Sequence, residues 1–357
     1  MTPGSLRLRC RDSYRATTIR SIRNLVFALV LFGPDPSPAN SRRALRGVEE
    51  YRKGNFAKAI QELRQEAAVG EPESQAYLGL MYDLGQGVKQ DFAQAVVWLR
   101  RAAEQGNATA QCGLGEMYHS GQGVPRDFGE ASHWFRRAAD QGDEHAQFQL
   151  GEMCSVGEGA RVAPREAAKW YLLSANQGDA LAQLRLGWIY DLGIGVDPDP
   201  KAAARWYRKS AEGKNDDAQC RLGRMNETGR GLGQDLGEAA LWYRRSADRG
   251  NAEALWRLGV LYRDGNGVPK NRSVAIALFG FAAGMGPEGG GWARPLMDTL
   301  YRHLTLAEFD AGQDLITRIS RGNAPISVQV DAFLLHAALD SAVFPAYRNP
   351  CDYLGFP

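Results

Sequence analysis

The sequence is poor in residues that build metal sites and disulfide frameworks, with five histidines and five cysteines among 357 residues. Alternating runs of apolar and polar residues rich in Val, Ile and Thr do not occur, so no β-sheet is predicted. An apolar run near the N-terminus, residues 25–32, has eight residues, whereas a membrane-spanning helix needs about 20. We therefore expect no integral membrane span.

The chain beyond its first 24 residues also lacks an excess of positive charge. The formal net charge is +2, but residues 1–24 contain six arginines and one acidic residue, Asp12, and so carry +5. The rest of the chain therefore carries −3. A nucleic-acid surface running along the chain would need a dense excess of Lys and Arg to displace phosphate counterions, and the acidic balance excludes one.

The N-terminal segment has the order that is typical of a secretory signal. A basic stretch is followed by the apolar run and then by a proline-rich segment, in which Ser37 and Ala39 are the small residues before a cleavage site at Asn40. We interpret residues 1–39 as a signal peptide or N-terminal targeting segment. The chain is then exported, periplasmic or secreted. The alternatives are an uncleaved N-terminal anchor and an organelle transit peptide.

A period of 36 residues organises the following 216 residues. Glycine recurs at this spacing six times, at Gly79, Gly115, Gly151, Gly187, Gly223 and Gly259. A Gly-x-Gly pair follows each of them six residues later. The six copies span residues 71–286, and each shows two segments with the helical spacing of small and apolar residues.

Capping residues mark where these helices begin. The first helix of a copy opens at Asn107, Asp143, Asp179, Asn215 or Asn251, and the second at Asp91, Asp127, Asp199, Asp235 or Asn271. Ala163 replaces the cap in the third copy, and the glycine that ends the second helix shifts to Gly213 in the fourth, which predicts a distorted corner. Two short helices bury their apolar faces by stacking on neighbouring pairs, so we predict an α-solenoid.

The repeat resembles a known family. Residues 76–88, AYLGLMYDLGQGV, followed by Asp91, Ala95, Trp98 and Gly106, are similar to the Sel1-like repeat, a relative of the tetratricopeptide repeat (TPR). The resemblance implies an all-α fold, a right-handed α/α superhelical solenoid of six 36-residue helix pairs. It also implies a protein that binds other proteins as an adaptor or regulator.

The segments on either side of the repeats complete the predicted domain organisation. Residues 40–70 resemble a TPR-like N-terminal unit, on Gly47, Tyr51, Gly54, Phe56 and Ala59. Beyond residue 286 the repeat dissolves, with the glycines at 289–291 marking the break. Helices predicted at 304–318, opened by Thr305 and Glu308, and at 327–339 would make residues 287–357 a set of capping helices and a tail.

Several patterns with a chemical alternative are interpreted as structural. Tryptophans recur in one register of the second helix, which indicates helix packing. The Gly-x-Gly pairs lie between helices and lack a third glycine, so they are turns rather than phosphate loops. No ligand set is evident around the histidines, and Cys112, Cys154, Cys220 and Cys351 are expected to be free thiols. We therefore predict no cofactor, no metal and no catalytic residues.

An enzyme of the cell wall is the weaker alternative. Some exported Sel1-type proteins are rich in cysteine, with one disulfide in each repeat, and have been described as penicillin-binding or β-lactam-hydrolysing. This chain has Ala102, Ala138 and Ser174 where that pair would be needed, and it lacks Ser-x-x-Lys and the other hydrolase motifs.

Partner binding would use positions that vary between copies. Arginine and tryptophan gather on the first helices of copies four to six, in a set that we call the arginine–tryptophan stripe: Arg185, Trp188, Arg221, Arg224, Trp256 and Arg257. These residue types dominate binding energy at interfaces, and guanidinium groups suit carboxylates. The alternative is that the arginines cover their helices or pair with Asp217 and Glu253.

The sequence thus predicts a non-enzymatic scaffold, adaptor or regulator in the cell envelope. Its partner would be a protein with an acidic or carboxylate-bearing segment, and neither nucleic acid nor an integral membrane position is expected. The alternatives are a β-lactam or peptidoglycan hydrolase or penicillin-binding protein, a secreted effector that binds a host protein, and a purely structural assembly factor for an envelope complex.

Overall fold

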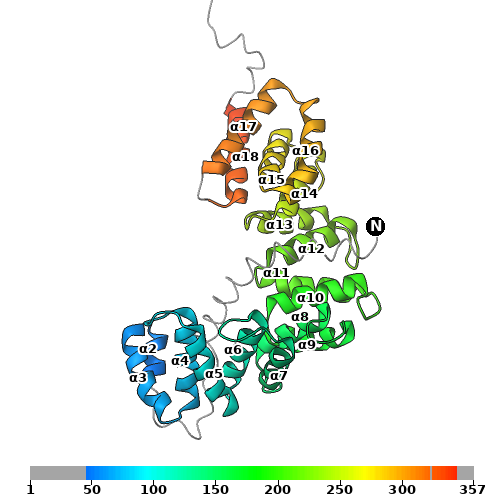
Figure 1. Cartoon of the computed structure of the whole chain (residues 1–357). Coiled ribbons are helices and arrows are strands. Elements are labelled where there is room, and N and C mark those ends of the chain that lie inside the picture. Colours follow the sequence, from blue (N-terminus) through cyan, green and yellow to red (C-terminus); the bar gives the residue numbers. More distant parts are fainter. Residues whose placement is uncertain (1–45, 322–323, 344–357) are drawn as a thin grey trace, which may run out of the picture. The chain divides into compact units, whose positions relative to one another are not determined.

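The computed structural model describes residues 46–321 and 324–343 (Figure 1). Residues 1–39, which we interpret as a targeting segment, and Cys351 therefore lie outside the described residues. Within them the chain forms 17 helices and no strand, as the all-α prediction requires. None of these helices is both long and apolar enough to span a membrane.

The helices follow one another in antiparallel pairs. The first pair is α2 (Arg46–Arg52) with α3 (Phe56–Ala68). The six repeats follow as α4 (Pro72–Leu84) with α5 (Phe92–Glu104), α6 (Ala108–Ser120) with α7 (Phe128–Ala139), α8 (Glu144–Val156) with α9 (Pro164–Gln177), α10 (Ala180–Leu192) with α11 (Pro200–Glu212), α12 (Asp216–Thr228) with α13 (Leu236–Ala247), and α14 (Ala252–Asp264) with α15 (Arg272–Gly284). The last three helices are α16 (Pro287–Tyr301), α17 (Leu306–Arg321) and α18 (Ile326–Val343). This is a helical solenoid with six repeats.

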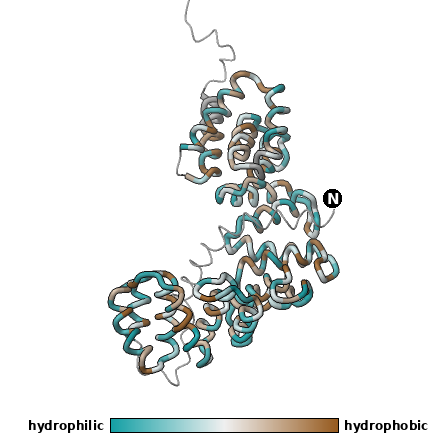
Figure 2. Tube along the Cα trace, in the orientation of Figure 1, coloured by the Kyte–Doolittle hydropathy of each residue, from teal (hydrophilic) through white to brown (hydrophobic). Residues whose placement is uncertain are grey.

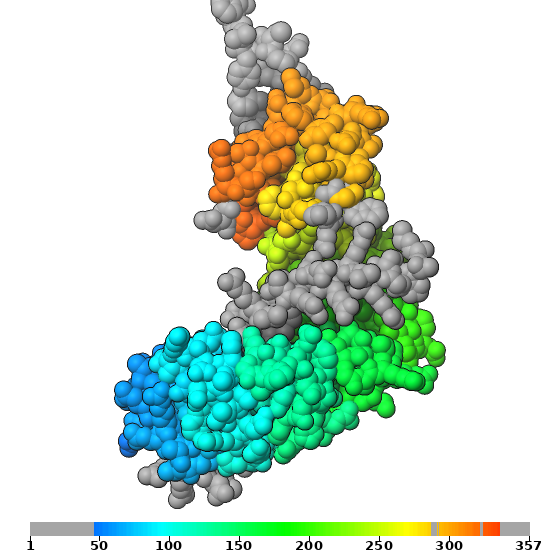
Figure 3. Space-filling view, in the orientation of Figure 1, coloured from blue at the N-terminus to red at the C-terminus, as the bar shows by residue number. Residues whose placement is uncertain are grey.

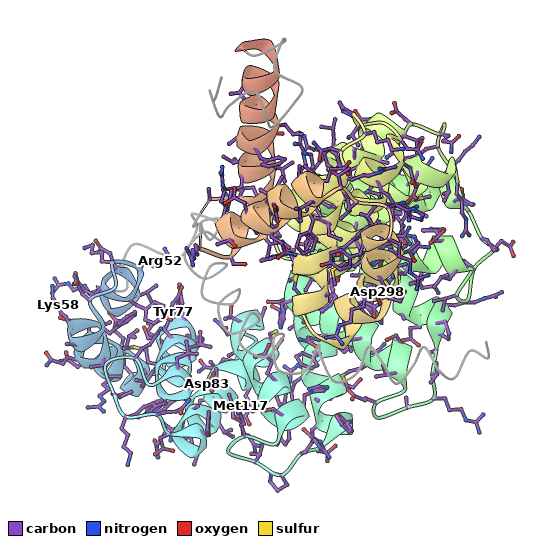
Figure 4. All side chains as sticks on the ribbon, turned by 90° about the horizontal axis from the view of Figure 1, so that it is seen from above. Arg52, Lys58, Tyr77, Asp83, Met117 and Asp298 are labelled. Carbon is purple, nitrogen blue, oxygen red and sulfur yellow. The ribbon has the colours of Figure 1, made fainter. Side chains whose placement is uncertain are left out.

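The described residues divide into two compact units. Unit 1 contains residues up to Leu150 together with Glu158–Ala160, and unit 2 contains Gly151–Gly157 and the residues from Arg161 onward. Apolar and polar residues succeed one another along every helix (Figure 2), and within unit 1 the helices pack directly against the next pair (Figure 3). In unit 1, for example, Tyr77 of α4 meets Tyr51 of α2 edge-on at 5.0 Å between ring centroids; Figure 4 labels Tyr77 and the neighbouring Arg52.

Each helix pair is held by one large side chain that packs over the repeat glycine. The glycine lies on the first helix, and the large residue lies on the second helix, one position after the tryptophan register. A Cβ atom added to Gly115 would lie 2.7 Å from Cδ1 of Phe135, and one added to Gly47 would lie 2.6 Å from Cγ of Leu63. The large residues are fully buried: Leu63, Leu99, Phe135, Tyr171, Tyr207, Tyr243 and Phe279. Glycine is thus required here for close approach of the two helices.

The tryptophans pack against this core at its edge, in agreement with the helix packing predicted for them. Trp134 and Trp242 are buried, whereas Trp98, Trp170 and Trp206 are half-buried. A basic side chain three positions later covers four of the rings: Arg101 over Trp98 at 4.7 Å, Arg137 over Trp134 at 5.0 Å, Lys209 over Trp206 at 4.4 Å and Arg245 over Trp242 at 4.5 Å. The ring therefore shields the core while its outer face binds a cation.

A buried glutamine joins each of the first five repeats to the helix pair before it, and Leu255 occupies the position in the sixth. Gln111 Nε2 donates to the carbonyl oxygen of Ala103 at 3.0 Å, at the end of the preceding second helix. The same bond recurs from Gln75, Gln147, Gln183 and Gln219. These amides satisfy carbonyl groups that the end of a helix leaves without a partner in the helix.

The predicted helix caps are present in both units. The side chains of Asn107, Asp143, Asp179, Asn215 and Asn251 each accept a hydrogen bond from a first-turn amide, and so do those of Asp91, Asp127, Asp199, Asp235 and Asn271. Ala163 makes no side-chain cap, as expected. The C-terminal helix α17 opens with the predicted capping box, in which Thr305 and Glu308 exchange hydrogen bonds.

The C-terminal helices extend the solenoid. Both α16 and α17 pack on α15, and α18 lies against α13, where Asp248 accepts hydrogen bonds from the Ser327 amide and hydroxyl at 2.7 and 2.6 Å. Residues 289–291, predicted to mark the end of the repeats, lie within α16. Arg244 pairs with Asp331 of α18.

The fourth repeat has the distorted corner that the shifted glycine predicts. Gly213 has φ of −69°, so the left-handed position falls on the next residue, Lys214, with φ of 65°. Lys214 is the one non-glycine residue with positive φ among those described. A left-handed conformation costs a residue with a Cβ atom about 1–2 kcal/mol.

Replacing Lys214 by glycine should remove this strain. We expect Lys214→Gly to raise the free energy of unfolding by about 0.5–1 kcal/mol, because the gain is partly offset by the greater freedom of glycine in the unfolded chain. Urea unfolding measures the change. Lys214→Ala is the control, because it removes the charge but keeps the Cβ atom; equal stability of the two variants would contradict the explanation.

Adding a side chain at the repeat glycine should lower the stability of the protein. We expect Gly115→Ala to lower the free energy of unfolding by about 1–3 kcal/mol, because the added methyl group meets the Phe135 ring. Gly284→Ala is the matched control, since this helical glycine has nothing within 4 Å of an added Cβ atom. The control should gain up to about 1 kcal/mol from helix propensity. A loss of the same size in both variants would count against the contact.

Candidate partner-binding site

The arginine–tryptophan stripe lies in unit 2, on three first helices. Arg185 and Trp188 belong to α10, Arg221 and Arg224 to α12, and Trp256 and Arg257 to α14. Residues three positions apart share a helix face, so α10 and α12 each present their two residues on one side, whereas Trp256 and Arg257 are adjacent in α14.

Two guanidinium groups from neighbouring helices lie against one indole ring. The Cζ atom of Arg185 lies 4.8 Å from the centroid of the Trp188 ring, and that of Arg221 lies 5.4 Å from it. Arg185 is also fixed by Glu152, with its Nε donating to Oε1 at 2.7 Å and Nη2 to Oε2 at 3.1 Å. This two-pronged pair leaves Arg185 little freedom to rotate toward another carboxylate.

The second half of the stripe is also paired. Arg257 donates from Nε to Glu253 Oε1 at 2.8 Å and from Nη1 to Glu227 Oε2 at 3.2 Å, and its Cζ lies 4.5 Å from the Trp256 ring. Arg224 Nη1 lies 3.6 Å from Glu253 Oε1, with both side chains more than a third exposed. The expected pairing with Glu253 is therefore present.

The expected pairing of an arginine with Asp217 is not present. Asp217 accepts a hydrogen bond from Asn251 Nδ2 at 3.1 Å instead. Burial and the adjacent Asp216 raise the pKa of this carboxyl group, while Arg221 acts to lower it. Arg221 is the one arginine of the stripe with no carboxylate within ion-pair distance among the described residues.

The arrangement can therefore bind one negative charge at a defined place. Arg221 offers a guanidinium group that is positioned by the Trp188 ring and not neutralised by an ion pair. A guanidinium group donates two parallel hydrogen bonds to a carboxylate, and the half-buried indole supplies apolar contact area beside it. The paired arginines on either side keep the local potential balanced.

Sequence reasoning missed the carboxylates that pair across repeats. They are Glu152 and Glu227, whose partners follow 33 and 30 residues later, and Glu116, whose Oε1 is hydrogen-bonded to Nε2 of His145 at 2.6 Å, 29 residues later. The sequence does contain a signal for these pairs. Along the first helices, an acidic residue is followed by a basic residue 29 to 33 positions later, slightly less than one repeat of 36 residues. Helical wheels of single copies do not show it.

None of the three described cysteines takes part in a disulfide, as predicted. Cys112 and Cys220 are buried and Cys154 is half-buried. Burial is the largest cause that raises the pKa of both buried thiols above their usual value. Cys112 lies beside Glu116 and His145, a proximity that sequence reasoning did not anticipate.

Comparison with known families agrees with the repeat in the structure. The Sel1 repeat matches the chain six times, at residues 72–107, 108–143, 144–179, 180–215, 216–251 and 252–287. The chain belongs to the Sel1 repeat family. Its members are commonly protein-interaction scaffolds.

Two solved structures show the same Sel1 fold at appreciable identity. A protective antigen of uropathogenic Escherichia coli strains, which displays an SLR fold, is 29% identical with a TM-score of 0.69, and the match covers 83% of this chain and 68% of that one. A Sel1 repeat protein from Oxalobacter formigenes is 35% identical with a TM-score of 0.60, covering 66% of this chain and 97% of that one. No curated protein matches the chain.

Three buried tyrosines predict that this Sel1 repeat protein loses stability at alkaline pH. Burial is the main cause that raises the pKa of Tyr171, Tyr207 and Tyr243 above the usual value. Above about pH 10 the unfolded chain loses these protons while the folded chain keeps them, so the free energy of unfolding falls as pH rises, by about 1.4 kcal/mol per pH unit for each group.

Urea unfolding at pH 9, 10 and 11 measures this dependence. We expect the midpoint to fall above pH 10, and we expect the loss between pH 10 and 11 to be smaller in Tyr243→Phe than in the parent chain. Midpoints that do not change up to pH 11 would contradict the explanation that the buried tyrosines keep their protons in the folded chain.

Proposed function

We propose that this Sel1 repeat protein is a non-catalytic scaffold of the cell envelope that binds an acidic segment of a partner protein at the arginine–tryptophan stripe. The observation that carries the proposal is Arg221, which lies on the Trp188 ring without a carboxylate partner among the described residues. The neighbouring arginines are already paired, so the stripe favours one anchoring carboxylate rather than a general attraction for anions.

An envelope location is part of the proposal. The signal-like order of residues 1–39 supports export. The similarity to a protective antigen of uropathogenic E. coli strains supports it as well. The paired charges around Arg221 support a partner that approaches with a defined orientation.

Binding experiments with a single-residue change test the proposal. Partners are cross-linked to the protein in the envelope fraction, and the affinity of each purified partner is then measured by calorimetry. We expect Arg221→Gln to weaken the complex by about 10- to 100-fold, because a hydrogen bond to a charged group contributes about 1.5–3 kcal/mol. Binding should also weaken with added salt.

The control makes the same charge change away from the stripe. Arg205 is exposed on α11, so Arg205→Gln should leave the affinity unchanged. Equal losses in the two variants would indicate a nonspecific effect of charge, and full affinity in Arg221→Gln would remove the stripe as the binding site.

A further inference from the structure

A cluster of three potential metal ligands lies in unit 1, away from the arginine–tryptophan stripe. The Sγ atom of Cys112, a carboxylate oxygen of Glu116 and a ring nitrogen of His145 all lie within 4.8 Å of one another. Cys112 and Glu116 are four residues apart on α6 and so share one face of that helix. His145 comes from the first turn of α8, in the next repeat.

The cluster is largely shielded from solvent and held in place by its surroundings. Cys112 is 6% exposed and His145 is 7% exposed. Asp143 fixes the start of α8 by accepting a hydrogen bond from the Ala146 amide at 2.8 Å, and its carboxylate also interacts with the Cys112 thiol. Gln149 Nε2 lies 3.1 Å from Nε2 of His145, the same ring nitrogen that contacts Glu116. Three side chains are thus directed at one point from two helices.

The same register three repeats later provides an internal comparison. Positions 108 residues further on hold Cys220, Arg224 and Glu253. There the guanidinium group of Arg224 lies 3.6 Å from the Glu253 carboxylate, so a permanent cation is part of the cluster. The cluster at Cys112 has no such residue: its three members are a thiol, a carboxylate and an imidazole.

We propose that Cys112, Glu116 and His145 bind a transition-metal cation of the Zn²⁺ class and so link α6 to α8. Sulfur, nitrogen and oxygen ligands together suit this borderline-soft ion, which takes distances of about 2.0–2.3 Å to them. Tetrahedral coordination at those distances separates ligand atoms by about 3.3–3.8 Å, so the cluster needs side-chain shifts of about 1 Å. Asp143 or a water molecule completes the coordination.

On binding, the metal replaces the hydrogen bond between Glu116 and Nε2 of His145 with two metal–ligand bonds. The proton of that hydrogen bond moves to Nδ1 of His145, and the thiol proton of Cys112 leaves to solvent. The cross-link joins two consecutive repeats that otherwise contact each other through side-chain packing and hydrogen bonds. The proposal is independent of the partner-binding stripe, since no residue is shared.

Cobalt titration of the full chain tests the site. The protein, purified without a histidine tag, reduced and stripped of metal with a chelator, is titrated with Co²⁺ and followed by absorption. We expect one equivalent to bind, with a thiolate-to-cobalt charge-transfer band and the intense visible bands of tetrahedral cobalt, and we expect Zn²⁺ to displace it. The melting temperature should rise with Zn²⁺.

The two cysteines in equivalent register separate this site from adventitious binding. Cys112→Ser should lose the charge-transfer band, whereas Cys220→Ser should keep it at full intensity. Glu116→Gln, at a half-buried position, should fold normally and bind Co²⁺ at least tenfold more weakly. Absence of the band in the parent chain, its persistence in Cys112→Ser, or unchanged affinity in Glu116→Gln would each overturn the proposal.

Discussion

The contact between a large side chain on the second helix and a glycine on the first sets the geometry of every repeat. At Gly115 and Phe135, as at Gly223 and Tyr243, the two helix backbones come close because one residue has no Cβ atom. With that spacing set, the buried glutamine reaches the preceding helix end, and the second glycine of each loop packs against the start of the preceding second helix. Neighbouring repeats therefore interlock through the same set of contacts.

This geometry explains why the side chains that differ between repeats, and that could bind ligands or partners, lie on the first helices. Their buried positions are occupied by small residues, glutamine and the repeat glycine, and the positions facing the adjacent first helix are free to differ. In unit 2 those positions form ion pairs across repeats, such as Glu152 with Arg185 and Glu227 with Arg257. In unit 1 they hold the cluster around His145. One scaffold thus presents a guanidinium group at Arg221 and a set of metal ligands at Cys112, Glu116 and His145.

Much of the fold could be predicted from the sequence because its signals are local. The period, the caps at Asn107 and Asp127, and the strained corner at Lys214 depend on residues that lie close together in the chain. For the partner-binding site, the sequence predicted the residues of the arginine–tryptophan stripe but not the ion pairs that they form. The stripe residues do gather on neighbouring helices, but their partners, Glu152 and Glu227, lie nearly one repeat away, and the pairing depends on how first helices stack. The buried position of Phe135 beside Trp134 was likewise hidden, because both residues are large and apolar.

The most direct test of the interlocking contacts is the removal of one complete repeat. Deleting residues 180–215 joins Asp179 to Asp216, so the cap of α10 would now open α12, and Gln219 would face the carbonyl group of Ala175. Interchangeable contacts predict a folded helical protein with one cooperative urea transition, whose m-value falls by about a tenth, in line with the share of the chain removed. Loss of cooperative unfolding would show instead that the repeats depend on particular neighbours, contrary to this account.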